Sequence, residues 1–313
     1  MRLSTLGRRP EITVFVGAAA IAFSGILFRL AHVSPSTGAF YRCFWALPAL
    51  WPIARWEQRR WGKRPLRARA FAWLAGLFFT ADLILWHNAI EQVGAGLATV
   101  LGNTQVVLVG LLAWLVFRER PPRASLYAIP AVSLGVLLIS GALEHGAYGS
   151  NPGLGAVYGV FTGLAYTGFL LVFRFAQRGI VGPAGPLFDA TLACAAGCLV
   201  VGAVVGDLDL TPSWSAQGWL VLLALSSQAA GWLFIAISLP RLPAVVTSVS
   251  LTLQPLCSVL LAALILGESP SGLQLLGAAG ILSGLVIASL GRRQASARMD
   301  APSSESSAAL TDT

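Results

Sequence analysis

The chain has 313 residues, of which 56% are hydrophobic and only 11% are charged. Soluble domains carry about 25% charged residues, so this chain has too few charged side chains to cover a surface that faces water. Apolar runs of about 20 residues, the length that crosses the hydrocarbon core of a bilayer, recur along the sequence. The composition therefore excludes a soluble globular protein and predicts an all-α integral membrane protein.

We expect ten transmembrane helices between two polar chain ends. Residues 1–11 are expected to form a cytoplasmic N-terminus, and the first apolar run is too long for the hydrophobic part of a signal peptide. Residues 291–313 are rich in Ser and Ala and are expected to form a disordered cytoplasmic tail. The expected spans cover residues 12–31, 36–56, 70–90, 94–116, 123–142, 153–175, 183–205, 217–238, 243–266 and 271–290.

The basic residues indicate the orientation. With the N-terminus in the cytoplasm, every Lys and Arg falls in a cytoplasmic segment except Arg29 and Arg42, which lie within spans. This is the positive-inside pattern. The formal charge of +8 is therefore read as a topology signal that faces anionic lipid, and no nucleic-acid partner is expected. We expect a multi-pass protein of the cell membrane, in a bacterial inner membrane, with both termini in the cytoplasm.

The sequence also repeats itself. Residues 244–268 match residues 95–119 when the chain is shifted by 149 positions, and the shift places Gln254 on Gln105 and Ser248 on Thr99. The match indicates a duplicated membrane unit.

The duplication predicts two inverted halves. The first repeat covers residues 12–142 and the second covers residues 153–290, and each holds five of the expected spans. Because five is an odd number, the second half enters the membrane in the opposite sense. Inverted repeats recur in secondary transporters, whose binding sites lie near the bilayer midplane between the halves.

The repeats resemble a known family. Each closes with a span rich in small residues, a Gln or Pro break, a terminal Glu and a Gly-containing span, as in the EamA-like transporters of the drug/metabolite transporter superfamily. The second copy fits best, with LTLQPLCSVLLAALILGES at residues 251–269 followed by Gly277, Gly280 and Gly284. The first copy departs from the pattern, because Val106 stands where the family often has Pro.

The segment AFYRCFWALPAL around Arg42 is also similar to the arginine-bearing span of that family. The resemblance implies a ten-helix inverted-repeat fold with both termini in the cytoplasm. It also implies export or exchange of small metabolites, such as amino acids or lipophilic or cationic compounds, by alternating access. It does not identify the substrate.

Two charges inside the expected spans need an explanation, because a charge at bilayer depth costs about 2.5–3.5 kcal/mol on insertion scales. At about 1.5 Å per residue, Arg42 lies about 9 Å and Asp82 about 11 Å from the outer ends of their spans. Matching depth and opposite sign predict an ion pair. It is either a substrate or proton site facing the cavity between the halves, or a closed pair that orders two helices.

Aromatic residues follow two of the polar positions at helical spacing. Trp86 comes four residues after Asp82, and Trp232 four residues after Gln228, so each pair shares a helix face. The tryptophans are expected either to line a cavity and stack on an aromatic or cationic substrate, or to pack against lipid and protein. His87 is a second candidate for proton coupling beside Asp82, unless it is hydrogen-bonded or interfacial.

Buried amides are further candidates for substrate binding. Gln105 and Gln254 occupy matching positions of the two repeats, and a buried amide in lipid needs partners. Helix-to-helix hydrogen bonds alone can also supply these partners. Gln228 and Tyr166 complete the candidate set.

Three carboxylates are expected near the membrane faces. Glu119 and Glu268 are expected to lie at opposite faces, each beside a helix start, where a carboxylate is favourable; a gate is the alternative. Asp189 is expected near the cytoplasmic face, with Arg174, Arg178 or water as its partner.

The sequence contains no nucleotide-binding motif, and its cysteines form no metal-ligand set. No cofactor, metal or enzymatic activity is therefore expected. The expected partners are a small-molecule substrate, the lipid bilayer and a proton as a candidate coupling ion, for a monomer or weak dimer. A sugar-phosphate or nucleotide-sugar antiporter is the alternative within transport, and an intramembrane enzyme is the alternative outside it. The cysteines, all within apolar runs, are Cys43, Cys194, Cys198 and Cys257.

Overall fold

The computed structural model describes residues 10–108, 111–112, 123–238 and 244–300, and this part of the chain is helical with no strand. The helices of the first half are α2 (Pro10–Ala22), α3 (Ser24–Ala31), α4 (Pro35–Phe44), α5 (Leu47–Trp61), α6 (Leu66–Val93), α7 (Ala95–Gly102) and α9 (Arg123–Ile139). Those of the second half are α10 (Pro152–Gln177), α11 (Ala184–Val205), α12 (Trp214–Leu223), the π-helix η1 (Ala224–Gly231), α13 (Trp232–Ser238), α14 (Ala244–Leu266) and α15 (Gly272–Asp300).

The helical membrane class predicted from the sequence is confirmed, whereas the count of ten spans stays a prediction. Within the described residues, five segments are long and apolar enough to cross a membrane, and four further apolar helices are shorter. The five long segments are Ile12–Ala31, Leu66–Val93, Pro152–Gln177, Ala184–Val205 and Trp214–Ser238.

Several expected spans are interrupted. The second is divided into α4 and α5 by a turn at Trp45 and Ala46, and Pro48 follows at the start of α5, where its missing N–H costs nothing. The first is divided at Phe23, where the hydroxyl of Ser24 donates to the carbonyl of Ile21. Helical hydrogen bonds continue through both turns: the N–H of Phe23 donates to the carbonyl of Ala19, and the N–H of Trp45 donates to that of Tyr41.

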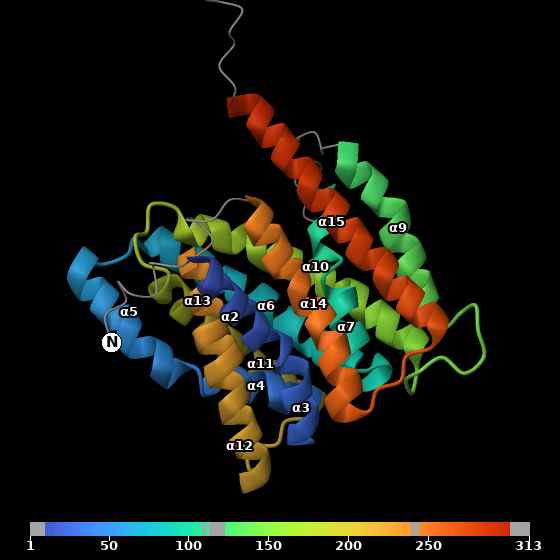
Figure 1. The fold of residues 1–313 in the computed structure, drawn as a ribbon. Helices are drawn as coiled ribbons and strands as arrows, with labels where there is room; N and C mark the ends of the chain where they lie inside the picture. The colour runs from blue at the N-terminus through green and yellow to red at the C-terminus, as the bar shows by residue number, and fades with distance from the viewer. Residues whose placement is uncertain (1–9, 109–110, 113–122, 239–243, 301–313) are drawn as a thin grey trace, which may run out of the picture.

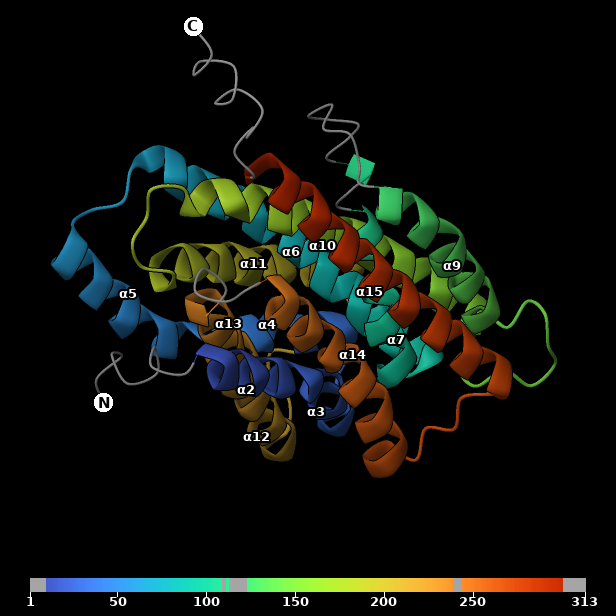
Figure 2. The same ribbon diagram turned by 45° about the horizontal axis from the view of Figure 1, so that its top comes forward.

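Helices of one half pack mainly on helices of the other. Repeat-related elements are neighbours: α4 and α5 contact α11, α7 contacts α14, and α9 contacts α15. Other pairs are exchanged, with α6 along α10 and with α2 and α3 along α12 and α13, and α6 and α2 also contact α11 and α14, respectively. Figures 1 and 2 show α9 and α15 side by side at one edge of the molecule, with α14 and α7 beside them.

The crossing of α9 and α15 shows that repeat-related helices run in opposite directions. A Cβ built on Gly277 would lie 2.6 Å from the carbonyl oxygen of Gly135. A Cβ built on Gly284, which comes later in α15, would lie 2.6 Å from Cγ2 of Val132, which comes earlier in α9. Moving forward along α15 therefore means moving backward along α9. The predicted inversion of the two repeats is present in this pair.

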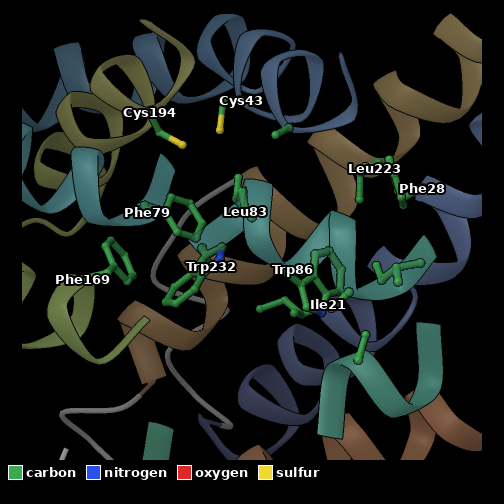
Figure 3. Close-up of a cluster of buried hydrophobic side chains, with 14 of the residues drawn as sticks. Ile21, Phe28, Cys43, Phe79, Leu83, Trp86, Phe169, Cys194, Leu223 and Trp232 are labelled. Carbon is green, nitrogen blue, oxygen red and sulfur yellow. The ribbon is translucent and has the colours of Figure 1, made fainter. Parts of the chain in front are cut away.

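The main apolar core contains residues from both halves. Phe79 and Trp86 come from α6, and Phe169 and Trp232 come from the second half; all four are buried. Figure 3 shows Phe79, Phe169 and Trp232 gathered together, with Trp86 and Ile21 farther along. All four cysteines are free, and Cys43, Cys194 and Cys198 are buried.

The C-terminal helix is longer than expected. α15 continues to Asp300, so a helix covers the first ten residues of the segment for which disorder was expected. Residues 301–313 lie outside the described residues, as does Glu119.

The close approach of α9 and α15 predicts a steric effect. Gly277→Ala places a methyl group 2.6 Å from the Gly135 carbonyl, so the helices must separate, at a cost of about 1–3 kcal/mol. The midpoint of thermal unfolding in detergent is expected to fall. Gly218→Ala in α12 is the control, because its Cβ meets nothing within 4 Å and alanine favours a helix. A midpoint for Gly277→Ala at or above that of the control would contradict this packing.

Candidate functional site

A cavity lies between the two halves and is lined by both. It offers about 60 Å³ to the centres of water-sized molecules, enough for a few waters. We call it the central cavity. Its lining residues are Ile21, Ser24, Arg42, Phe79, Asp82, Leu83, Trp86, Thr99, Gly102, Asn103, Thr162, Tyr166, Trp232 and Gln254.

Arg42 enters the central cavity from α4 and is held by two neighbours. Its Nε donates to Oε1 of Gln228 at 3.1 Å, and its guanidinium lies over the ring of Trp86, 5.5 Å from the centroid. Gln228 belongs to the π-helix η1 and donates in turn to Thr191 at 3.2 Å. The extra residue of a π-helical turn often marks a functional site, and here it presents the amide that orients Arg42.

Asp82 enters the same cavity from α6 and has no polar partner. It is 7% exposed, and it makes no hydrogen bond or ion pair with another described residue. The ion pair predicted between Arg42 and Asp82 is therefore not formed, although the two residues line one cavity. A buried carboxylate without a partner is costly in a low dielectric, so it favours a proton or a cation at this position.

An aromatic wall closes one side of the central cavity. The Trp232 ring meets Phe79 and Tyr166 edge to face, each at 6.0 Å between centroids, and Phe169 packs behind at 5.5 Å. Figure 3 shows this cluster without Tyr166. The Nε1–H of Trp232 is buried and finds no acceptor among the described residues. Buried donors normally have one.

The two symmetric glutamines lie in different places. Gln254 lines the central cavity, whereas Gln105 does not. Gln105 is 8% exposed, and its backbone carbonyl accepts from the hydroxyl of Thr167 at 3.4 Å. Gln228 also lies outside the lining, where it supports Arg42.

His87 is buried away from the central cavity. Its ring stacks on Phe28 with centroids 4.0 Å apart, and its Nδ1 lies 3.1 Å from the carbonyl oxygen of Pro35. It is absent from the cavity lining. The hydrogen-bonded interpretation of His87 fits this position.

Several lining residues were not singled out from the sequence, among them Phe79, Thr99, Asn103 and Thr162. Helical spacing held a signal for two of them. Phe79 comes three residues before Asp82, and Asn103 comes four residues after Thr99, so each shares a face with another lining residue.

Glu268 joins the two halves at one end of the molecule. Its carboxylate accepts from the backbone N–H groups of Ala95 at 2.6 Å and Gly96 at 3.1 Å, at the start of α7. A helix start has unpaired N–H groups and a positive dipole end. The predicted helix-start role is therefore present, but the helix belongs to the other half rather than to the segment that follows Glu268. Burial raises the pKa of this carboxyl, and the two N–H groups act in the opposite direction.

The second and seventh expected spans are joined at both ends by a carboxylate that accepts from the start of the other span. Asp207, which follows α11, accepts from the backbone N–H of Ser36 in α4 at 3.3 Å. Glu57, near the end of α5, accepts from Ala184 at 3.0 Å and Gly185 at 2.8 Å, at the start of α11.

These contacts lie at opposite ends of α6. Glu57 comes shortly before the start of α6 in the chain, whereas Ala95, which donates to Glu268, comes shortly after its last residue. α6 has 28 residues and therefore spans about 42 Å, close to the full thickness of a bilayer with its headgroups. Carboxylate contacts thus join the halves on both sides of the central cavity.

Asp189 has partners other than those predicted. Its Oδ2 lies 2.7 Å from Nη1 of Arg64 and 3.3 Å from Nε of Arg69, and its side chain is 3% exposed. The expectation of Arg174 or Arg178 was wrong, because the α5–α6 connection brings basic residues of the first half over the start of α11. The arrangement does place Asp189 away from Arg42, as expected.

The central cavity can bind a molecule that carries both charges. It offers one guanidinium, one unpaired carboxylate, an amide and an aromatic wall. Within the described part of the chain, no group of three or more His, Cys, Asp or Glu residues could hold a metal ion.

Comparisons with known proteins bear on the family and the fold. The sequence model of the EamA-like transporter family matches residues 8–141 and again residues 153–290. No curated protein matches the sequence. A chain of known structure described as "Crystal structure of protein" is similar, with a TM-score of 0.60 and 17% identity over 91% of this chain and 98% of that one. At this identity the likeness shows a shared fold alone.

The Glu268 contacts predict an effect on stability. Glu268→Ala leaves two buried N–H groups without an acceptor, which costs about 1–3 kcal/mol each, so the thermal midpoint in detergent is expected to fall by several degrees. Glu268→Gln keeps an acceptor oxygen and is expected to retain most of the stability. Glu91→Gln, an exposed change at the end of α6, serves as the control. Equal midpoints for Glu268→Ala and this control would contradict the role.

The same carboxyl predicts a pH effect. Because burial raises the pKa of Glu268 above its ordinary 4.5, ionisation costs more in the folded than in the unfolded protein. This cost disappears as the pH falls through the raised pKa. The midpoint of the wild-type protein relative to Glu268→Gln is therefore expected to rise on acidification toward pH 4.5. A difference that stays constant or falls would oppose the assignment.

Proposed function

The chain belongs to the EamA-like transporter family, and from that premise we propose that it is a secondary transporter of a small zwitterion. The substrate is an α-amino acid with an apolar or aromatic side chain. It is exported or exchanged by alternating access between the two repeats. The observation that carries the proposal is the pair of opposite charges, Arg42 and Asp82, that line one cavity without pairing with each other.

Each charge matches one end of a zwitterion. Arg42 uses Nε to bind Gln228, which leaves its terminal amino groups to donate to a carboxylate. Asp82 supplies the carboxylate for an ammonium group. Both side chains are almost fully buried, and no ion pair joins them, so a ligand that binds both groups would offset the cost of burying the two charges. A free amino acid satisfies both charges at once.

The rest of the cavity favours an apolar side chain. Phe79, Tyr166 and Trp232 form the aromatic wall, and Trp86 supports Arg42. Gln254 adds an amide that can donate and accept.

The alternatives considered from the sequence fit the site less well. A sugar-phosphate antiporter needs several cations for its substrate, and Arg42 is the one cation in the lining. An intramembrane aspartyl enzyme needs two carboxylates at one position, and Asp189 is instead paired with Arg64 and Arg69, outside the lining.

Transport requires one end of the central cavity to open at a time. The cavity holds only a few waters, and carboxylate contacts join the halves at both ends. A substrate enters when the contacts of one end separate. From the positive-inside pattern of the basic residues, we assign the Glu57 end to the cytoplasm and the Glu268 end to the outside.

Two variants, each lacking one of the two charges, test the zwitterion site, because each is expected to lose its preference for one charged end of the substrate. In proteoliposomes, the wild-type protein is expected to bind phenylalanine at least about tenfold tighter than phenethylamine or 3-phenylpropionate, because each analogue leaves one buried charge unpaired. Arg42→Gln is expected to bind phenethylamine as well as phenylalanine, and Asp82→Asn to bind 3-phenylpropionate as well as phenylalanine. Inhibition of counterflow measures the affinities.

The controls are Arg59→Gln and Glu91→Gln, which remove exposed charges outside the cavity. If both site variants lost affinity equally for phenylalanine, phenethylamine and 3-phenylpropionate, the assignment of the two charges would be wrong. A wild-type protein that does not bind phenylalanine would refute the proposed substrate class.

Proton coupling is assigned to Asp82 rather than His87. Asp82 faces the cavity without a partner, whereas His87 is stacked on Phe28 outside it. Asp82→Asn is expected to abolish accumulation driven by a pH gradient while retaining exchange at equal pH when phenylalanine is saturating, and His87→Gln is expected to keep both. Radiolabelled uptake with and without the gradient measures this. Gradient-driven accumulation that survives Asp82→Asn would rule out the assignment.

A further inference from the structure

A second cavity lies where α5, the α5–α6 connection and the start of α11 meet. It offers about 500 Å³ and is much larger than the central cavity. Figures 1 and 2 show α5 at the edge of the molecule. We call it the basic cavity. Its lining residues are Trp51, Ala54, Arg55, Gln58, Lys63, Arg64, Leu66, Arg69, Phe188 and Asp189.

The basic cavity has an excess of positive charge. Four cations and one carboxylate line it, which leaves three positive charges. Asp189 holds Arg64 at 2.7 Å and Arg69 at 3.3 Å, so two guanidinium groups are fixed in position before any ligand arrives. The nearby Glu57 is already engaged by the N–H groups of α11.

Two further cations are available to a ligand. Arg55 lies over the ring of Trp51, 5.2 Å from the centroid, and Lys63 is exposed. Neither forms an ion pair with another described residue. Guanidinium groups match the geometry of phosphate oxygens, and an ammonium adds a point charge.

The rim of the basic cavity is apolar and continues along a membrane-spanning helix. Leu66 is 82% exposed and Trp51 is 51% exposed. Farther along α6, Trp73 and Leu77 are also exposed, on a helix that is long and apolar enough to span a bilayer. An anionic group in the cavity would therefore adjoin a surface that contacts acyl chains.

We propose that the basic cavity binds the headgroup phosphate of an anionic phospholipid, with the acyl chains lying along the exposed face of α6. Basic pockets between transmembrane helices bind acidic headgroups in this way. The bound lipid would join α5 of the first half to α11 of the second, beside the Glu57 contact. This site is separate from the central cavity and does not depend on the transported substrate.

Binding of lipid to the detergent-purified full chain tests the proposal, measured by native mass spectrometry against phosphatidylglycerol, phosphatidylcholine and inorganic phosphate. The double variant Arg55→Gln/Lys63→Gln removes the two cations that Asp189 does not hold. It is expected to weaken phosphatidylglycerol binding roughly 30-fold, because each cation near a headgroup contributes about 1 kcal/mol. Phosphatidylcholine is expected to bind weakly to all proteins.

Arg59→Gln/Arg60→Gln is the matched control, since it removes the same charge from α5 outside the basic cavity. It is expected to leave phosphatidylglycerol binding within about twofold, and thermal unfolding without lipid checks that both variants are folded. An equal loss in the control would assign the effect to overall charge and overturn the proposal. Equal binding of phosphatidylcholine would also overturn it. Inorganic phosphate that binds as tightly as phosphatidylglycerol would make the site one for a soluble phosphate.

Discussion

The structure depends on the antiparallel pairing of helix ends across the two repeats. A helix start in a membrane exposes N–H groups that lipid cannot satisfy. Here the acceptors are carboxylates at the ends of the repeat-related helices: Glu268 serves α7, Glu57 serves α11, and Asp207 serves α4. Each contact crosses between the halves, so these N–H groups gain their carboxylate acceptors when the two repeats are assembled head to tail.

This pairing determines where a binding site can form. The crossing contacts lie toward the ends of the helices, and the central cavity lies between them, lined by both halves. Arg42 and Asp82 enter it from adjacent helices, and no ion pair joins them among the described residues. On the proposed function, the site is complementary to a molecule that carries both charges, and the enclosing contacts would separate during transport.

The sequence was sufficient for the membrane class, the duplication and most helix positions, because hydropathy and an internal match depend on local residues alone. It also placed Arg42 and Asp82 at one depth, and they share a cavity. The depth of a residue in the membrane does not say which way its side chain faces, because the rotation of each helix about its axis depends on packing. The sequence therefore predicted neither the lack of an ion pair between Arg42 and Asp82 nor the exclusion of Gln105 from the cavity lining. The partners of Asp189 lie 120 and 125 residues away in the chain, a separation that carries no local signal.

The most direct test of alternating access in this chain is a pair of distances measured by pulsed electron paramagnetic resonance in lipid. Spin labels at Glu91 and Ser269 report on the end held by Glu268, and labels at Arg59 and Val181 report on the end held by Glu57; all four positions are exposed. On addition of phenylalanine, the account predicts that one distance lengthens while the other shortens. Two fixed distances, or two that lengthen together, would contradict it.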